Sequence, residues 1–198
     1  PNYLQVFFLI IIGAIIILSL NMFYTMSMHR PYGVWDAWAM YNRTARFIFR
    51  GGVHWRNAFS PELPWYFHAD YPPLIALNIA SGWNAIGEET LRIPMVIGGA
   101  FLFGSTGLLF AGVNAYKTLG QATLAIGALF SISGYIGVGA MQVSDIPLSF
   151  FILSTGILLY IHSIKKQKEL FILSGLSAGL AAWTKNEGIL FAIASCIA

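Results

Sequence analysis

The ionisable side chains of this chain are concentrated in one stretch, residues 31–74. It holds three of the eight acidic residues (Asp36, Glu62 and Asp70) and four of the eleven basic residues, all arginines. Long apolar runs flank the stretch on both sides. Ionisable groups in a membrane-embedded chain indicate a functional site by default, although a long external loop is also polar simply because it is solvated. Carboxylates beside cations suit proton transfer and the binding of an anion.

Asp36 and Asp145 are the carboxylates best placed for general-base chemistry. Asp36 lies between Trp35 and Trp38, and Asp145 lies between two apolar runs. Either side chain could deprotonate or orient an acceptor hydroxyl, and the two could face each other across a site. Each also has a structural explanation, because an acid in the first turn of a helix is stabilised by the helix dipole.

His68 and Asp70 stand two residues apart, so they could pair or supply two ligands to a metal. A protein metal site usually takes three or more ligands, and the single cysteine, Cys196, excludes a cysteine cluster and a disulfide framework. We therefore favour a structural turn or a substrate contact over a divalent metal. We predict no cofactor and no resident metal.

Lys185 interrupts a pair of apolar runs, where a lysine is costly unless it is paired. Glu187 could neutralise it within the chain, or a phosphate group of a ligand could do so. Arg43, with Arg46 and Arg50, could serve the same anion, although arginines on a surface helix also contact lipid headgroups.

The composition indicates an integral membrane protein. The chain is 57% apolar and only 10% charged, with a mean hydropathy of +0.69, whereas soluble domains are about 25% charged. Six apolar runs are predicted to span a bilayer, the last two being short or incomplete: residues 3–21, 93–116, 118–144, 146–164, 170–184 and 188–198. Residues 1–28 carry no charge and so lack the basic region of a signal peptide. Because the chain lacks an initiator methionine and ends in an apolar run, we expect it to be the N-terminal part of a longer protein.

Alternation of these spans places Asp36, Asp70, Asp145 and Lys185 on one side of the membrane. The short turns on the other side carry Lys117 and, at residues 165–168, three further lysines. Short basic turns mark the cytoplasm, so we expect the loop of residues 22–92 to be extracytoplasmic, with the plasma or inner membrane as the location. This division of the basic residues argues against a nucleic-acid partner.

Two helices are expected within the external loop. Trp38, Tyr41, Ala45 and Ile48 recur at helical spacing and predict an amphipathic surface helix over residues 36–50, which Gly51 and Gly52 end. Asp36, Arg43 and Arg50 recur every seven residues and are expected on its opposite face. Pro72 and Pro73 are expected to open a second helix over residues 74–86. The predicted fold is all-α: a polytopic helical bundle with amphipathic surface helices in its first external loop, forming one domain over residues 1–198.

Three segments give the chain a family resemblance: DYPPL at 70–74, SDIPLSFF at 144–151 and GLSAGLAAWTK at 175–185. In their order, after a first span and an acid in the first loop helix, they resemble the GT-C superfamily of membrane glycosyltransferases. The resemblance is to the branch of protein O-mannosyltransferases and lipid A aminoarabinose transferases. It implies a sugar donor on a dolichyl or undecaprenyl phosphate and a lipid, glycan or protein acceptor.

By position, Asp36 resembles the catalytic acid of the family's first loop, and Asp145 resembles its second-loop acid. Lys185 matches a lysine that meets the carrier phosphate, and Asp70 the acid ahead of the proline pair. Tyr71 stands where the aminoarabinose transferases carry a lysine, a departure that bears on the phosphate contacts and the donor. Pro147 stands where oligosaccharyltransferases place a second carboxylate, which argues against their metal-dependent branch.

The leading hypothesis is therefore a glycosyltransferase with Asp36 and Asp145 as catalytic residues. Substrate-binding residues would be Asp70, His68, Tyr71, Arg43, Lys185 and Glu187. A transporter or flippase for a lipid-linked anion is the main alternative, and it predicts ionisable residues at mid-span depth and broken helices. A scaffold whose loop binds a partner is a third reading, and it predicts that charge changes at Asp36 and Asp145 are tolerated.

Overall fold

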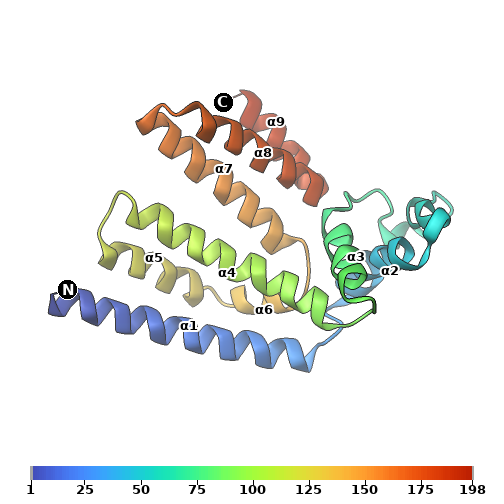
Figure 1. Ribbon diagram of the computed structural model, residues 1–198, viewed down its shortest axis with the longest axis horizontal. Helices are drawn as coiled ribbons and strands as arrows, with labels where there is room; N and C mark the ends of the chain where they lie inside the picture. Colours follow the sequence, from blue (N-terminus) through green and yellow to red (C-terminus); the bar gives the residue numbers. More distant parts are fainter. Residues whose placement is uncertain (1, 198) are drawn as a thin grey trace.

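The computed structural model describes residues 2–197, and every regular element in that range is a helix. The longer helices run roughly side by side, and a compact hairpin closes one end of the molecule (Figure 1). In chain order the helices are α1 (Tyr3–His29), α2 (Asn42–Arg50), α3 (Leu74–Ile86), α4 (Arg92–Asn114), α5 (Leu119–Ser131), α6 (Tyr135–Ala140), α7 (Asp145–Lys165), α8 (Lys168–Thr184) and α9 (Asn186–Ile197). The all-α prediction is confirmed.

Three of these helices, α1, α4 and α7, are long and apolar enough to cross a membrane. They correspond to the predicted spans 3–21, 93–116 and 146–164, with α1 continuing to His29. Most side chains of α1 are exposed although they are apolar, and its few buried ones include the polar Ser27, a distribution that suits a helix surrounded by lipid. A membrane location is therefore compatible with the fold.

The predicted span over residues 118–144 is not one helix. α5 ends at Ser131, and Gly134 adopts a left-handed φ of 89° before the short α6 begins. The backbone of α6 then lies against α4, where a Cβ on Gly98 would meet the carbonyl oxygen of Gly139 at 2.7 Å. An uncharged run is consistent with one long span, but hydropathy does not register a backbone break at Gly134.

The helix predicted over residues 36–50 forms, with one change of register. A π-helical segment, Ala37–Tyr41, precedes α2 and widens one turn. Consequently Tyr41 and Ala45 are buried as expected, whereas Trp38 is 42% exposed. The expected polar face also divides, because Asp36 and Arg50 are exposed and Arg43 turns partly inward.

α3 pairs with α2 in a hairpin and forms as predicted, ending at Gly87 with a left-handed φ of 79°. Its buried face, centred on Ile79 and Trp83, packs against Tyr41 and Ala45. The Trp83 indole N–H donates to the Thr90 carbonyl at 2.8 Å, which ties the helix to the segment that enters α4. Two short 3₁₀ segments, Gly52–Phe59 and Trp65–Phe67, connect α2 to α3.

The α2–α3 hairpin lies at the end of the molecule where α1 and α8 finish and where α4, α7 and α9 start (Figure 1). α7, α8 and α9 pack on one another in sequence, and α8 also reaches α3. Segments that are more than a hundred residues apart in sequence therefore meet at this end. The opposite end carries the turns that connect α4 to α5 and α7 to α8.

Candidate functional site

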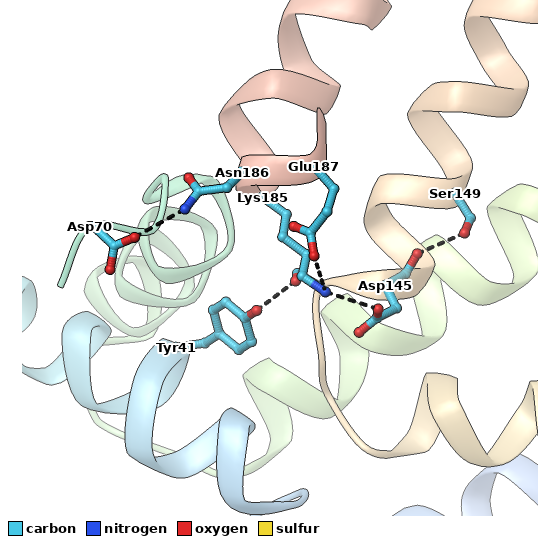
Figure 2. Close-up of polar contacts among 8 residues, drawn as sticks. Tyr41, Asp70, Asp145, Ser149, Lys185, Asn186 and Glu187 are labelled. Atoms are coloured by element: carbon cyan, nitrogen blue, oxygen red, sulfur yellow. Dashed lines mark hydrogen bonds and ion pairs between the residues drawn. The ribbon is translucent and has the colours of Figure 1, made fainter. Parts of the chain in front are cut away.

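Lys185 lies at the tip between α8 and α9 and holds two carboxylates at once. Its Nζ is 3.2 Å from Asp145 Oδ1 and 3.3 Å from Glu187 Oε1. Figure 2 shows the ammonium between the two acids, one at the first residue of α7 and the other in the first turn of α9. The lysine side chain is 18% exposed, whereas the acids are 55% and 57% exposed.

The electrostatics of this ion-pair cluster favour a fully charged lysine. Burial of the ammonium lowers its pKa, but the hydrogen bond and charge of Asp145, followed by those of Glu187, outweigh burial and raise the pKa to about 12. Two carboxylates against one ammonium leave the cluster with a surplus negative charge. Lys185 is thus neutralised within the chain. Glu187 is one partner, as one of the two alternatives from the sequence proposed, and Asp145 is the other.

A second contact joins the segment ahead of α3 to the same tip. The Asn186 side-chain amide donates to Asp70 Oδ2 at 3.0 Å, and His68 Nδ1 lies 3.8 Å from Asp70 Oδ1 (Figure 2 shows the Asn186 contact). The His68 ring also stacks at a tilt on Tyr71, with centroids 4.8 Å apart. Within residues 2–197 no group of three or more potential metal-binding side chains comes together.

Tyr41 and Ser144 form a buried contact that the sequence did not single out. The two hydroxyl oxygens are 2.5 Å apart, and the pair joins the surface helix to the residue before α7. Burial raises the pKa of Tyr41 to about 12, although the Ser144 hydrogen bond and the Lys185 charge oppose the rise. The only signal in the sequence was the place of Tyr41 on the apolar stripe, which predicts packing and says nothing of a polar partner.

The Tyr71 hydroxyl is influenced by the charges of several of these groups. Burial raises its pKa, the charge of Glu187 raises it further, and Lys185 opposes the rise. The carboxylates of Asp70 and Asp36 act on it in the same direction as Glu187. Tyr71 therefore lies within the electrostatic field of residues from the first loop, α9 and the start of the surface helix.

Arg43 is separated from the two arginines expected to act with it. Its guanidinium lies over the Phe67 ring, 4.5 Å from the centroid, and Nη2 makes a long contact of 3.5 Å to the Phe67 carbonyl. Nε and Nη1 are buried and contact no hydrogen-bond acceptor among the described residues, and burial lowers the pKa of the group. Nη2 also donates to the Thr44 hydroxyl at 3.3 Å, so the cost of burial falls on the two nitrogens that lack acceptors.

Arg46 and Arg50 instead share Glu89, which follows α3. Arg50 binds the carboxylate with two hydrogen bonds, and Arg46 Nε lies 3.4 Å from Oε2. Two of the three arginines are thus paired within the α2–α3 hairpin, and the expectation that all three serve one anion stays a prediction. An open groove of about 340 Å³ runs along the three arginines and Phe47.

Asp36 is exposed beside aromatic residues at the same end of the molecule. Its neighbour Trp35 packs edge-on against Trp38, with ring centroids 4.4 Å apart. The Trp35 ring also lies at a tilt to the Tyr66 ring, with centroids 6.2 Å apart. Among the described residues no hydrogen bond or ion pair involves the Asp36 carboxylate, so it does not join Asp145 directly. It is available to a ligand, next to rings of the kind that occur at membrane interfaces.

Comparison of the chain with models of known protein families, with curated proteins and with solved structures gives no match. Its chemistry therefore has to be inferred from its own geometry.

Proposed function

We propose that this chain belongs to a membrane glycosyltransferase that moves a sugar from a polyprenyl-phosphate carrier to an acceptor on the extracytoplasmic side. One observation carries the proposal. The end of the bundle that bears the α2–α3 hairpin carries three kinds of group: the exposed Asp36 carboxylate, which has no partner among the described residues, the Arg43 guanidinium, which is short of acceptors, and the Asp145–Lys185–Glu187 cluster. A transfer of this kind requires a base for the acceptor and a cation for the phosphate that leaves.

In the proposed reaction an acceptor hydroxyl oxygen bonds to the anomeric carbon of the donor sugar. The bond from that carbon to the phosphate oxygen breaks with inversion, and the acceptor proton passes to Asp36. The carrier leaves as polyprenyl phosphate, whose negative charge grows in the transition state. Asp145 accepts the hydrogen bond from Lys185 at Oδ1, and we propose that its Oδ2 accepts a hydrogen bond from a hydroxyl of the sugar or the acceptor.

Arg43 is the cation best suited to the leaving phosphate. Lys185 already has two carboxylate partners, so a phosphate that approached it would meet their surplus negative charge. Two nitrogens of Arg43 lack acceptors, and a phosphate would supply the missing hydrogen bonds. Lys185 then positions Asp145 and Glu187 and contributes charge at longer range, while Asp70, His68 and Tyr71 line the approach.

The test uses the full-length protein in liposomes, with radiolabelled polyprenyl-phosphate sugars and a membrane extract as the acceptor source. Wild type should transfer label, and Asp36→Asn and Asp145→Asn should each lower the rate by at least about a hundredfold, as loss of general acid–base catalysis does. Glu62→Gln is the matched control, since Glu62 is an exposed acid of the same loop outside the cluster. Transfer that survives Asp36→Asn would refute the proposed base.

One observation favours a transporter or flippase for a lipid-linked anion. The break between α5 and α6 is the interrupted helix that this class predicts within an apolar run. Its residues are uncharged, however, and the strong charges lie at helix ends. Movement of a carrier lipid across the liposome bilayer without label transfer would favour the transporter, and a change such as Gly134→Leu would then stop that movement.

A further inference from the structure

An apolar groove runs between α4 and α7, far from the candidate site. It has a volume of about 600 Å³ and is lined by residues at helical spacing on both helices, among them Leu109 and Val113 on one wall and Leu153 and Ile157 on the other. This volume falls in the range of about 300–1,000 Å³ that is usual for small-molecule sites. Both walls belong to helices that are long and apolar enough to span a membrane, so lipid hydrocarbon is the surrounding expected for the groove.

The end of the groove that lies away from the α2–α3 hairpin is polar and basic. Lys117 lines it together with Tyr116 and Tyr160, whose rings meet edge-on at 5.3 Å. α4 and α7 both start at the α2–α3 end, so this rim lies at the opposite end of the molecule (Figure 1). Three more exposed lysines occur there, and within residues 2–197 none of the four makes an ion pair: Lys117, Lys165, Lys166 and Lys168.

We infer that this groove binds one acyl chain of an anionic phospholipid, with the lipid phosphate at Lys117 and the two tyrosine hydroxyls. Tyrosine and lysine at the end of an apolar groove are the side chains that meet headgroups at the membrane interface. A second copy of the chain fits less well. The lined stretch of α4 covers about two turns, or about 11 Å, whereas a packed spanning helix needs contact along about 30 Å.

Two glycines make a sharp test. A side chain on Gly156 would project into open space in the groove, and one on Gly175 of α8 would meet open space outside it. Gly156→Leu should therefore fill the groove without strain in the fold, and Gly175→Leu is its matched control. Lys117→Gln removes the rim charge, and Lys168→Gln removes a lysine of the same end that does not line the groove.

The measurement is native mass spectrometry of the full-length protein released from bilayers of equimolar phosphatidylglycerol and phosphatidylcholine. Wild type should retain phosphatidylglycerol about fivefold over phosphatidylcholine, which is the size of effect that one lysine near an anionic lipid gives. Gly156→Leu should lose the retained lipid and Gly175→Leu should keep it. Lys117→Gln should still hold lipid with a ratio near one, and Lys168→Gln should keep the preference.

Four results would overturn the inference. Wild type could retain both phospholipids equally, the two leucine variants could behave alike, or Gly156→Leu could convert a dimer to a monomer, which would assign the groove to a second copy. Added polyprenyl phosphate that displaces the phospholipid from wild type at equimolar concentration would assign the groove to the carrier lipid instead. Circular dichroism of each variant checks that the fold is retained.

Discussion

Two charge clusters at the same end of the molecule have opposite composition. Beyond α3, one carboxylate, Glu89, serves two arginines, and its side chain is 18% exposed. At the α8–α9 tip, one ammonium, Lys185, serves two carboxylates and is also 18% exposed. In each cluster the shared residue is the less exposed one and its partners reach toward solvent.

This difference distinguishes the Glu89 cluster, a structural fastening within one hairpin, from the Lys185 cluster, where the site is proposed. The Glu89 cluster joins α2 to the end of α3, neighbours in a local hairpin that Trp83 already packs together. The Lys185 cluster joins the starts of α7 and α9, and the Asn186–Asp70 contact adds the first loop. Because the Lys185 cluster gathers groups from distant segments and its carboxylates are exposed, we place the proposed ligand site there.

The largest expected effect comes from the backbone of the α8–α9 tip. A Cβ on Gly188 would fall 1.9 Å from the Ala181 carbonyl oxygen, so Gly188→Ala forces the two helices apart and moves Lys185 from its partners without a change of charge. We expect a loss of about 3 kcal/mol in the free energy of unfolding, at the upper end for overpacked positions. Thermal unfolding in detergent measures it.

Gly179→Ala in α8 is the matched control, because its Cβ meets nothing within 4 Å. Alanine is the better helix former, so the thermal midpoint of this variant should hold or rise. Equal midpoints for Gly188→Ala and wild type would mean that α8 and α9 do not pack as described.

Removal of the shared cation tests the tip directly. Lys185→Met keeps the length of the side chain but leaves Asp145 and Glu187 to repel each other, at an expected cost of about 2 kcal/mol, between the values for exposed and buried pairs. The folded pKa of about 12 lies above the usual 10.5. The stability from this pair is therefore full below pH 10.5 and is lost as the pH rises toward 12.

The measurement is the thermal midpoint as a function of pH. In Lys185→Met the midpoint should lack the part of the decline between pH 10.5 and 12 that the lysine causes in wild type. Lys117→Met serves as the control, since Lys117 is exposed and makes no ion pair with the described residues. A wild-type decline that persists in full in Lys185→Met would show that the cluster does not hold the tip.

Tyr41→Phe should have a smaller effect, because it removes one hydrogen bond and leaves the ring packed. The expected cost is about 1 kcal/mol. Burial raises the pKa of Tyr41 from 10.0 to about 12. Its contribution is accordingly full below pH 10 and falls as the pH rises to 12, because the unfolded tyrosine ionises first.

The Tyr41 and Lys185 contributions overlap in pH, so the double variant should decline least on the alkaline side. Tyr24→Phe on the exposed face of α1 is the control and should leave the midpoint unchanged. Identical effects of Tyr41→Phe and Tyr24→Phe would rule out the contact to Ser144.

The sequence predicted those features that local patterns determine. Proline at the start and glycine at the end gave the bounds of α3, and hydropathy gave α1, α4 and α7. Alternation of spans also predicted that Asp70, Asp145 and Lys185 lie on one side, and in the structure the three lie close together (Figure 2). The break at Gly134 and the π-helical turn at Ala37–Tyr41 were missed, because both depend on packing against neighbouring helices.

The partners of each charge could not be predicted in the same way. Arg43, Arg46 and Arg50 follow one another at spacings of three and four residues on one short helix and looked equivalent. They differ only because Glu89, which follows α3, pairs with Arg46 and Arg50, whereas Arg43 lies over the Phe67 ring. Likewise, nothing in the local pattern joins Tyr41 to Ser144, which is 103 residues away.

Glu89→Gln should have the smallest effect on stability at neutral pH, since Arg50, which binds it with two hydrogen bonds, is 66% exposed and the hairpin has its own apolar core. The sharper readout is acid pH. The hydrogen bond from Arg50 holds the pKa of Glu89 below its usual 4.5, so the contribution is present above pH 4.5 and disappears as the pH falls through the lowered value. Thermal midpoints below pH 4.5 should therefore decline in wild type and stay flatter in Glu89→Gln, with Glu88→Gln, its exposed neighbour, as the control. The two clusters would then fail at opposite ends of the pH range, the two-arginine cluster in acid and the two-carboxylate cluster in alkali. If Glu89→Gln altered the alkaline limb instead, the hairpin and the tip would form one coupled unit, and the distinction between fastening and site would no longer hold.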